Sequence, residues 1–481
     1  MIQVSPSPIP NSHVAGLMAS LLDRDAYLIG LLNKTVETRN IGETRNIGET
    51  RYIASLHWLQ EIKYCAQNWV RHSILPTTRD EEWRFTDLSA LKQINFNVNM
   101  QNVETRYIAS LPLPIASLPL PVASLPEAQN SRLVFVNGVY AAELSSVAGL
   151  PEGVVVTNLS NLPAAYTERA KEYFAQAEGA LEVFTALNTA GMQDAAVIWV
   201  AKNLAVETPI HLVYVTAGKE PVISQPRCLV VAEAGSQVTF VEEFIDHRGT
   251  EGTELEGKRG YLANAVTEIW ISDNASVNHT RVQRDSNEAF HIGKTAVTQA
   301  RCSRYTCNAL AFGGKVSRHN LEILQTGEQT ETTLNGLVMI KGEQVGDMHS
   351  AIALNHPHGI SNQLQKNIVG DRAHAVFNGK VFVPKPAQMT NAAQLNRNLM
   401  LSPKARVDTK PQLEITADNV KCAHGATVSQ LEDDEIFYLQ SRGINEHDSR
   451  QLLVNAFATE IINNIPVASL RDNLLDFVKQ F

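Results

Sequence analysis

The feature that most constrains the fold is a series of short apolar runs that recurs from Leu133 onward. The runs are roughly five to eight residues long, rich in β-branched and aromatic side chains, and separated by turn residues. They read LVFVNGVY, VVVTNL, AAVIWVA, IHLVYVTA, RCLVVAEAGSQVTFVEEF and TEIWISDNASVNHTRV. This pattern predicts a body built mainly of short strands.

A small-residue motif recurs at the corners between strands, in EAGSQVTF, DNASVNHT, GDRAHAVFNG and SPKARVDT. Each copy has a turn residue, then a small residue, then apolar residues at alternate positions. Stacked coils would produce this pattern, because the chain turns at each corner and the next strand faces inward. A parallel β-helix and a large β-sandwich both fit, and the residues alone leave the choice open.

The residues before Leu133 have a different sequence pattern. Residues 14–34 and 52–75 place apolar side chains at helical spacing, which predicts helices. Between them ETRNIG is written twice and then varied, and the stretch from Val103 iterates ASLPLP. These units are far shorter than structural repeats, and the prolines of the second stretch favour an extended chain. We predict a helical N-terminal domain over 1–132, with low-complexity inserts at about 35–51 and 103–126 that have no chemical role.

The period changes again at Gln430, after which the residues fit three helices. Gly443 ends the first, Asn445 caps the second, and Pro466 separates the second from the third. The predicted apolar positions are Leu431, Ile436, Phe437 and Leu439, then Leu452, Leu453, Ala456, Phe457 and Ile461, then Leu470, Leu474 and Phe477. Residues 429–481 should form a helical C-terminal domain behind a strand body at 133–428.

The best candidate for chemistry is the pair Cys422 and His424, in the segment KCAHGATVSQ. Alternate residues of a strand point to one face, so the two side chains should lie side by side. A thiolate and an imidazole are suitable ligands for iron or for sulfur-bearing species. Two ligands are too few to hold a cluster, which favours a site that a second chain completes.

Composition and charge exclude several classes of protein. A net charge of -9 argues against a dedicated nucleic-acid surface, and no uncharged apolar run reaches the ~18 residues of a membrane span. The N-terminus lacks the basic start and apolar core of a secretory signal, so we expect a cytoplasmic protein. The five cysteines form no CxxC pair, which makes a stable zinc site or a self-contained cluster unexpected.

Three other patterns carry weaker signals. The segment FGGK lacks the rest of a phosphate-binding loop, so the chain should not hydrolyse ATP. His349, His356 and His358 lack a helical metal-binding register, and we interpret them as structural or turn histidines. The pair Glu242 and Glu243 is interpreted as a solvated or interface strand end.

Two long strings, LNRNLMLSPKARVDTKPQLEI and VKCAHGATVSQLEDDEIFYLQSRGI, resemble the SufB/SufD family, and within it the SufD branch. These proteins are scaffold subunits of the SUF system for iron–sulfur cluster assembly. The resemblance covers the chain from about Leu133 to the C-terminus. It implies a right-handed parallel β-helix over 133–428. Upstream, LPTTRDEEWRFTDLSAL is similar to the family's entry segment, in which Trp83 and Phe85 are expected to be packing anchors.

The resemblance also implies a function. The chain would be a noncatalytic scaffold that pairs with SufB through its β-helix and docks the SufC ATPase through its C-terminal helices. His424 would be a metal ligand at the SufB interface, where a transient iron–sulfur cluster forms, with Cys422 as an accessory. No stably bound cofactor, nucleic acid or membrane partner is implied, while a flavin in the complex and a homodimer of the chain alone stay open.

Departures from SufB place the chain in the SufD branch. SufB has His-Glu-Ala-Thr where this chain has His424-Gly425-Ala426-Thr427, and the SufB cysteine stretch is matched here by Gln394-Leu395-Asn396 without a thiol. The rival hypothesis is a β-helix carbohydrate-active enzyme. Such an enzyme needs clustered carboxylates and usually an aromatic groove, but aromatic residues make up 6% of the chain and no carboxylate pair stands out.

Overall fold

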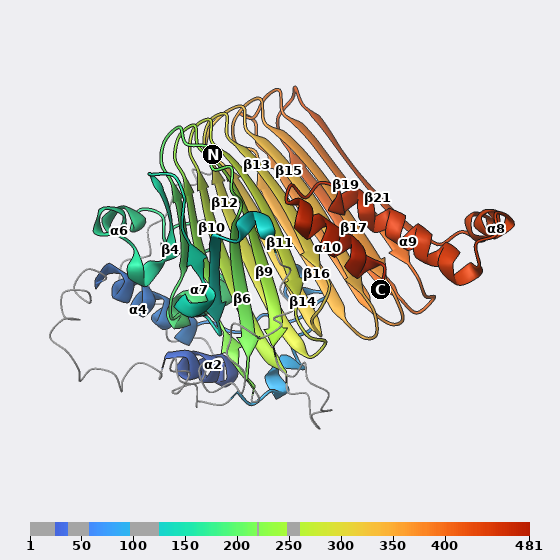
Figure 1. The fold of residues 1–481 in the computed structure, drawn as a ribbon, viewed down its shortest axis with the longest axis horizontal. Helices are drawn as coiled ribbons and strands as arrows, with labels where there is room; N and C mark the ends of the chain where they lie inside the picture. Colours follow the sequence, from blue (N-terminus) through green and yellow to red (C-terminus); the bar gives the residue numbers. More distant parts are fainter. Residues whose placement is uncertain (1–24, 37–56, 97–124, 219–220, 248–259) are drawn as a thin grey trace.

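The computed structural model describes residues 25–36, 57–96, 125–218, 221–247 and 260–481. Strands account for 42% of the structure and helices for 24%, so the chain is mainly β, as predicted (Figure 1). Nearly all of both predicted inserts, and the beginnings of both predicted N-terminal helices, lie outside the described residues.

The strands form two sheets. The eleven-stranded sheet, here called sheet A, contains β1 (Ser131–Val136), β2 (Val139–Tyr140), β3 (Ser146–Val147), β6 (Ile210–Ala217), β9 (Gln237–His247), β11 (Ser276–Arg284), β13 (Arg304–Ala311), β15 (Glu331–Ile340), β17 (Ile360–Val369), β19 (Asn391–Met400) and β21 (Lys421–Gln430). The ten-stranded sheet, sheet B, contains β4 (Val154–Asn158), β5 (Ala196–Val200), β7 (Ile223–Ser224), β8 (Arg227–Ala232), β10 (Tyr261–Ile271), β12 (Ala289–Gln299), β14 (Val316–Gln325), β16 (Val345–Ala353), β18 (His374–Val383) and β20 (Arg406–Ile415).

From β8 onward the chain alternates between the two sheets, and each strand pairs in parallel with the strand one coil further on. The result is a β-solenoid of about eight turns. This topology confirms the stacked coils and the parallel β-helix, and it excludes the sandwich. The first coils differ, because β1 pairs antiparallel with β2 and β3, and β4 pairs antiparallel with β5.

The corner motif has a simple physical basis. Asn274, Cys302 and Asp371 have positive φ angles of 60°, 56° and 48°, which turn the chain sharply between strands. A small side chain that is completely buried follows closely, such as Ala275 or Ala373. The left-handed residue therefore makes the corner, and the small residue lets the next strand enter the interior. Apolar side chains at alternate positions then fill the space between the sheets.

Helices from the N-terminal part cover the outer face of sheet B. They are α2 (Ala26–Val36), α4 (His57–Arg71) and α7 (Val183–Gly191), with α6 (Ala164–Ala170) nearby. Short 3-10 helices connect these elements: Glu81–Trp83, Leu91–Gln93, Pro126–Ala128, Ala142–Leu144 and Leu159–Asn161. Trp83 is buried against Phe184, with a ring separation of 5.5 Å, and lies beneath the Arg318 guanidinium. The expectation that Trp83 is a packing anchor is therefore confirmed.

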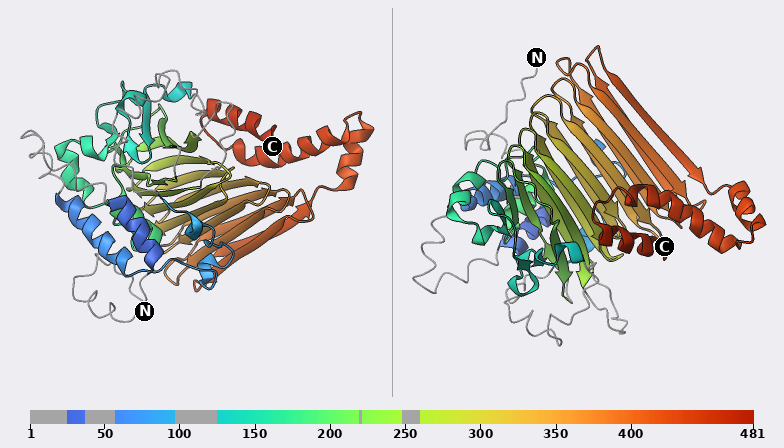
Figure 2. Two further views of the ribbon diagram at one scale, coloured as in Figure 1. Left: turned by 90° about the horizontal axis from the view of Figure 1, so that it is seen from below. Right: turned by 45° about the horizontal axis from the view of Figure 1, so that its top comes forward.

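The C-terminal helices lie on the opposite side of the solenoid (Figure 2). They are α8 (Asp433–Ser441), α9 (Glu446–Ile462) and α10 (Ala468–Val478). The C-terminal half of α9 and the whole of α10 pack on the outer face of sheet A, through an apolar cluster that includes Leu337 and Ile461. Helix α8 instead projects away from the body, with Phe437 70% exposed.

The predicted ends of these helices are confirmed, but one predicted face is not. Gly443, with φ 87°, follows α8, and Asn445 caps α9 by accepting a hydrogen bond from the backbone of Asp448. On α9 the buried positions include Val454 and Ala458, whereas Leu452 is 48% exposed. The first turns of α9 lie beyond the sheet, so an apolar side chain there has no surface to pack against.

Candidate functional site

The last coil is the uncovered end of the solenoid. Strands β20 and β21 are the terminal strands of sheets B and A, so each leaves one edge without a neighbouring strand among the described residues (Figures 1 and 2). None of the ten residues of β21 is fully buried: eight are exposed and the other two are half-buried. A long strand with a free edge is a template for pairing with a second chain.

Cys422 and His424 lie on β21, and both face the same side of the strand. The register pairs Cys422 with Ala392 and His424 with Gln394, whose side chains point into the solenoid. Cys422 is half-buried against the core. Burial raises the pKa of its thiol, and a hydrogen bond with the backbone of Ala392 offsets part of this increase. His424 is exposed. The structure therefore brings the predicted pair together at the uncovered end.

A ladder of amide side chains lies directly beneath His424. Gln394 Nε2 donates a hydrogen bond of 2.8 Å to Gln363 Oε1, and Gln363 Nε2 donates one of 2.8 Å to the Ser350 hydroxyl. Gln394 is 3% exposed, and its Oε1 atom has no hydrogen-bond partner among the described residues. The interior next to the predicted ligand pair is thus polar, and one buried acceptor there is unused.

The ligand pair is not completed within the described part of the chain. No group of three or more His, Cys, Asp or Glu side chains there could hold a metal ion. A ligand role for His424 and Cys422 stays a prediction, and it requires further ligands from another molecule.

Two buried carboxyl groups of β9 differ from the prediction. Glu242 and Glu243 are both fully buried, so the interpretation as a solvated or interface strand end is wrong. They lie on opposite faces of β9, as neighbours on a strand must. Glu242 points inward and lies 2.9 Å from His279 Nε2, while Glu243 lies 2.8 Å from His211 Nε2.

The inward pair is part of a longer network. His279 stacks on the Phe240 ring at 4.3 Å, and its Nδ1 atom lies 3.0 Å from the Tyr305 hydroxyl and 3.9 Å from Cys307 Sγ. Burial would lower the pKa of His279, but the neighbouring Cys307 and Glu242 raise it to about 9. His279 is therefore an imidazolium at neutral pH, and it lies beside Glu242. No signal in a single sequence marks such a pair, because its members lie on different coils.

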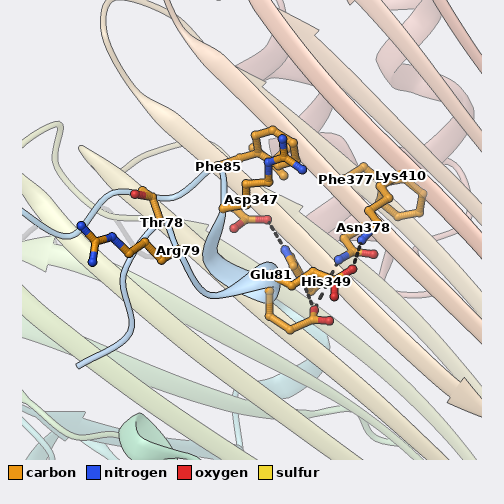
Figure 3. Close-up of a pocket in the computed structure, with 12 residues that line it drawn as sticks. Thr78, Arg79, Glu81, Phe85, Asp347, His349, Phe377, Asn378 and Lys410 are labelled. Atoms are coloured by element: carbon orange, nitrogen blue, oxygen red, sulfur yellow. Dashed lines mark hydrogen bonds and ion pairs between the residues drawn. The ribbon is translucent and has the colours of Figure 1, made fainter. Parts of the chain in front are cut away.

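A pocket of about 310 Å³ lies on the outer face of sheet B, where the segment containing Glu81 and Glu82 crosses β16, β18 and β20 (Figure 3). Its floor contains His349 and the buried Asp347, whose carboxylate pairs with Arg318 at 2.6 Å. His349 lies 2.9 Å from Asp347 and 3.3 Å from Glu82.

The three histidines of this region have different positions. His349 belongs to the ion-pair network under the pocket, whereas His356 and His358 lie in the turn between β16 and β17, with φ of His358 at 62°. The interpretation as structural and turn histidines agrees with these positions.

The fold and the uncovered end define a class of protein: a β-solenoid with flanking helices that presents Cys422 and His424 on a free strand edge. Comparisons with known proteins agree with this class. Residues 214–457 match the family model for the SufBD core domain of SUF system FeS cluster assembly, and residues 50–212 match the model for the SufBD protein N-terminal region.

Several relatives are similar over most of their length. An iron–sulfur cluster assembly SufBD family protein of Synechocystis sp. is 49% identical, over 83% of this chain and 86% of that protein. A chloroplastic protein of Arabidopsis thaliana is 35% identical, over 88% and 86%. The iron–sulfur cluster assembly protein SufD of Escherichia coli is 31% identical, over 84% and 89%.

The chain belongs to the SufBD family of the SUF system and serves iron–sulfur cluster assembly. The relatives named SufD support the assignment to the SufD branch. No helix among the described residues is both long and apolar enough to cross a membrane.

Proposed function

We propose that this chain is a noncatalytic scaffold subunit that pairs with SufB through the uncovered end of its solenoid and binds the SufC ATPase through its C-terminal helices. The observation that carries the proposal is the free edge of β21, which presents Cys422 and His424 on a strand with no neighbour beyond it among the described residues.

The end of the stack has the chemistry of an interface. Val428 is 48% exposed, Ile415 36% and Met389 53%, and all three belong to the last coils. Exposed apolar side chains beside a free strand edge favour burial against another chain. A second β-solenoid that ends in the same way would supply both a strand and an apolar surface.

The ligand pair supports the same arrangement. The cluster is the cargo of this system, and His424 with Cys422 offers it two ligands on one side of the interface. The missing ligands would come from SufB. Because the site is complete only in the pair, a cluster would form there transiently and would leave when the interface opens.

Helix α8 supports the second contact. Phe437 and Tyr438 are 70% and 57% exposed on a helix that projects from the body. Adjacent exposed aromatic side chains are typical of interaction sites. Three acidic residues in the first turn of α8 add a charged rim. We assign this helix and the first turns of α9 to SufC.

The contact at the solenoid end is tested by co-purification with tagged SufB. Val428→Asp places a charge on the exposed end and should abolish capture of the chain. Val147→Asp is the matched control, because Val147 is 39% exposed on β3 in the first coil, at the opposite end of the solenoid. Equal capture of both variants would refute the assignment. The tag on SufB keeps any homodimer of this chain out of the readout.

The contact at α8 is tested separately with tagged SufC. Phe437→Ser should lose SufC while keeping SufB, since its side chain supports no core packing. Tyr64→Ser is the control, because Tyr64 is 62% exposed on α4, on the other side of the solenoid. Retention of SufC by Phe437→Ser would contradict the role of α8.

The pocket of Figure 3 does not support the carbohydrate-active alternative. A glycoside hydrolase needs one carboxylic acid with a raised pKa as its proton donor. Here the hydrogen bond from His349 lowers the pKa of Glu82, and Arg318 and His349 hold the pKa of Asp347 well below its usual value despite burial. Both groups are carboxylates that cannot supply a proton.

A further inference from the structure

The buried amide of Gln394 is the starting point for an inference that rests on the proposed function. Its Oε1 atom has no hydrogen-bond partner among the described residues, although the side chain is 3% exposed. Buried amide oxygens almost always accept a hydrogen bond, and an exception calls for an explanation. The missing donor should therefore be sought among the groups that face this atom.

The strand register supplies one donor. Gln394 and His424 are direct partners on β19 and β21, so their side chains lie on the same face of sheet A. In-register partners on neighbouring strands lie about 4.8 Å apart. A turn of the exposed imidazole toward the interior brings one ring nitrogen within hydrogen-bond reach of the amide below it.

The amide is held so that its oxygen is the free atom. Gln394 Nε2 donates to Gln363 Oε1 at 2.8 Å, and Gln363 is fixed in turn by Ser350. Across the interior, Gly379 makes room for the side chain, because a Cβ atom there would lie 2.3 Å from Gln394 Nε2. Packing and the ladder together leave Oε1 as an acceptor in a fixed position.

We propose that Gln394 is a positioning residue for His424: its Oε1 accepts the ring N–H, which fixes one tautomer and presents the other nitrogen to iron. A metal-ligating histidine commonly donates its second N–H to an oxygen acceptor that orients the ring. Here that acceptor is neutral and belongs to the adjacent coil.

The test uses ¹⁵N-histidine NMR of the full chain, with the His424 signal assigned by its loss in His424→Gln. The tautomer of wild type should be biased toward one form. Gln394→Met, which keeps the size of the side chain but removes the acceptor, should move the nitrogen shifts toward a mixture of tautomers. Gln394→Glu should restore the bias, because a carboxylate also accepts. Gln365→Met is the control, because Gln365 is an interior amide of β17 whose register partner is Asn396.

A second readout is the iron and sulfide content of the complex with SufB and SufC. Gln394→Met should lower it roughly tenfold, while Gln394→Glu and Gln365→Met stay near wild type. Unchanged nitrogen shifts in Gln394→Met would overturn the proposal. If His424→Gln carries normal cluster while Gln394→Met still shifts the tautomer, the positioning contact stands and the ligand role of His424 fails.

Discussion

Removal of the charge on Glu242 tests whether the solenoid interior holds a true ion pair. Glu242 and His279 are both completely buried, 2.9 Å apart, and the Thr267 hydroxyl donates to the second carboxylate oxygen. In Glu242→Gln the shape is kept and the charge is lost. His279 then loses one of the two neighbours that raise its pKa, the other being Cys307.

The upper limit of the effect follows from the pKa of His279, which Cys307 and Glu242 together raise from an ordinary value of 6.5 to about 9 in the folded chain. Each unit of that difference corresponds to about 1.4 kcal/mol, so the two neighbours together contribute on the order of 3 kcal/mol to the free energy of unfolding. Because the folded pKa is the higher one, this stability is fully present below pH 6.5 and disappears as the pH rises through 9.

Urea unfolding followed by tryptophan fluorescence at pH 6 and pH 9.5 measures the effect. Glu242→Gln should lose up to about 3 kcal/mol at pH 6 and much less at pH 9.5. Glu331→Gln is the control, because its partner Arg304 lies 3.3 Å away and both side chains are more than half exposed. That variant should lose less than about 1 kcal/mol at both pH values. An equal loss at both pH values in Glu242→Gln, or a loss no larger than that of the control, would show that Glu242 does not stabilise a protonated His279.

Three further predictions concern single side chains. Gly379→Ala should lower the free energy of unfolding, measured in urea, by about 1–3 kcal/mol, because the new Cβ would lie 2.3 Å from Gln394 Nε2 and 2.6 Å from the Phe377 ring. Gly425→Ala, on the open strand β21, is the control and should change it little. Asn445→Ala removes the cap of α9 and should cost about 1 kcal/mol and speed proteolysis between α8 and α9, while Asn463→Ala should do neither. In Asp347→Asn the melting temperature should fall less steeply than in wild type as the pH is lowered. Burial would raise the pKa of Asp347, but Arg318 and His349 keep it below its usual value. The stability that this carboxylate contributes is therefore present at neutral pH and lost as the pH falls. The same acid dependence of the melting temperature in Asp347→Asn and wild type would contradict this.

Much of the fold could be predicted from local signals. The corner motif DNASVNHT indicated stacked coils because a left-handed residue and a buried alanine are local requirements, and the structure has Asn274 and Ala275 in those roles. The cap at Asn445 is local for the same reason. The choice between β-helix and sandwich depended on which strands pair, which no local pattern contains.

The interior network could not be predicted because its members are far apart in the sequence. Glu242 and His279 meet only when β9 and β11 are adjacent, and a glutamate on a strand is ordinarily a surface residue. The position of Leu452 on α9 was misjudged for a similar reason. Its helical spacing was suitable, but that turn of the helix extends beyond the sheet on which the rest of α9 packs.

The role of His424 at the uncovered end is measured by the iron and sulfide content of the chain co-purified with SufB and SufC, in wild type, His424→Ala and His72→Ala. His72 is an exposed histidine at the end of α4, on the far side of the solenoid, and serves as the matched control. We expect all three complexes to form, His72→Ala to carry as much cluster as wild type, and His424→Ala to carry roughly tenfold less or lower still. Equal cluster in His424→Ala and wild type would contradict the claim that the uncovered end of this solenoid supplies a ligand for cluster assembly.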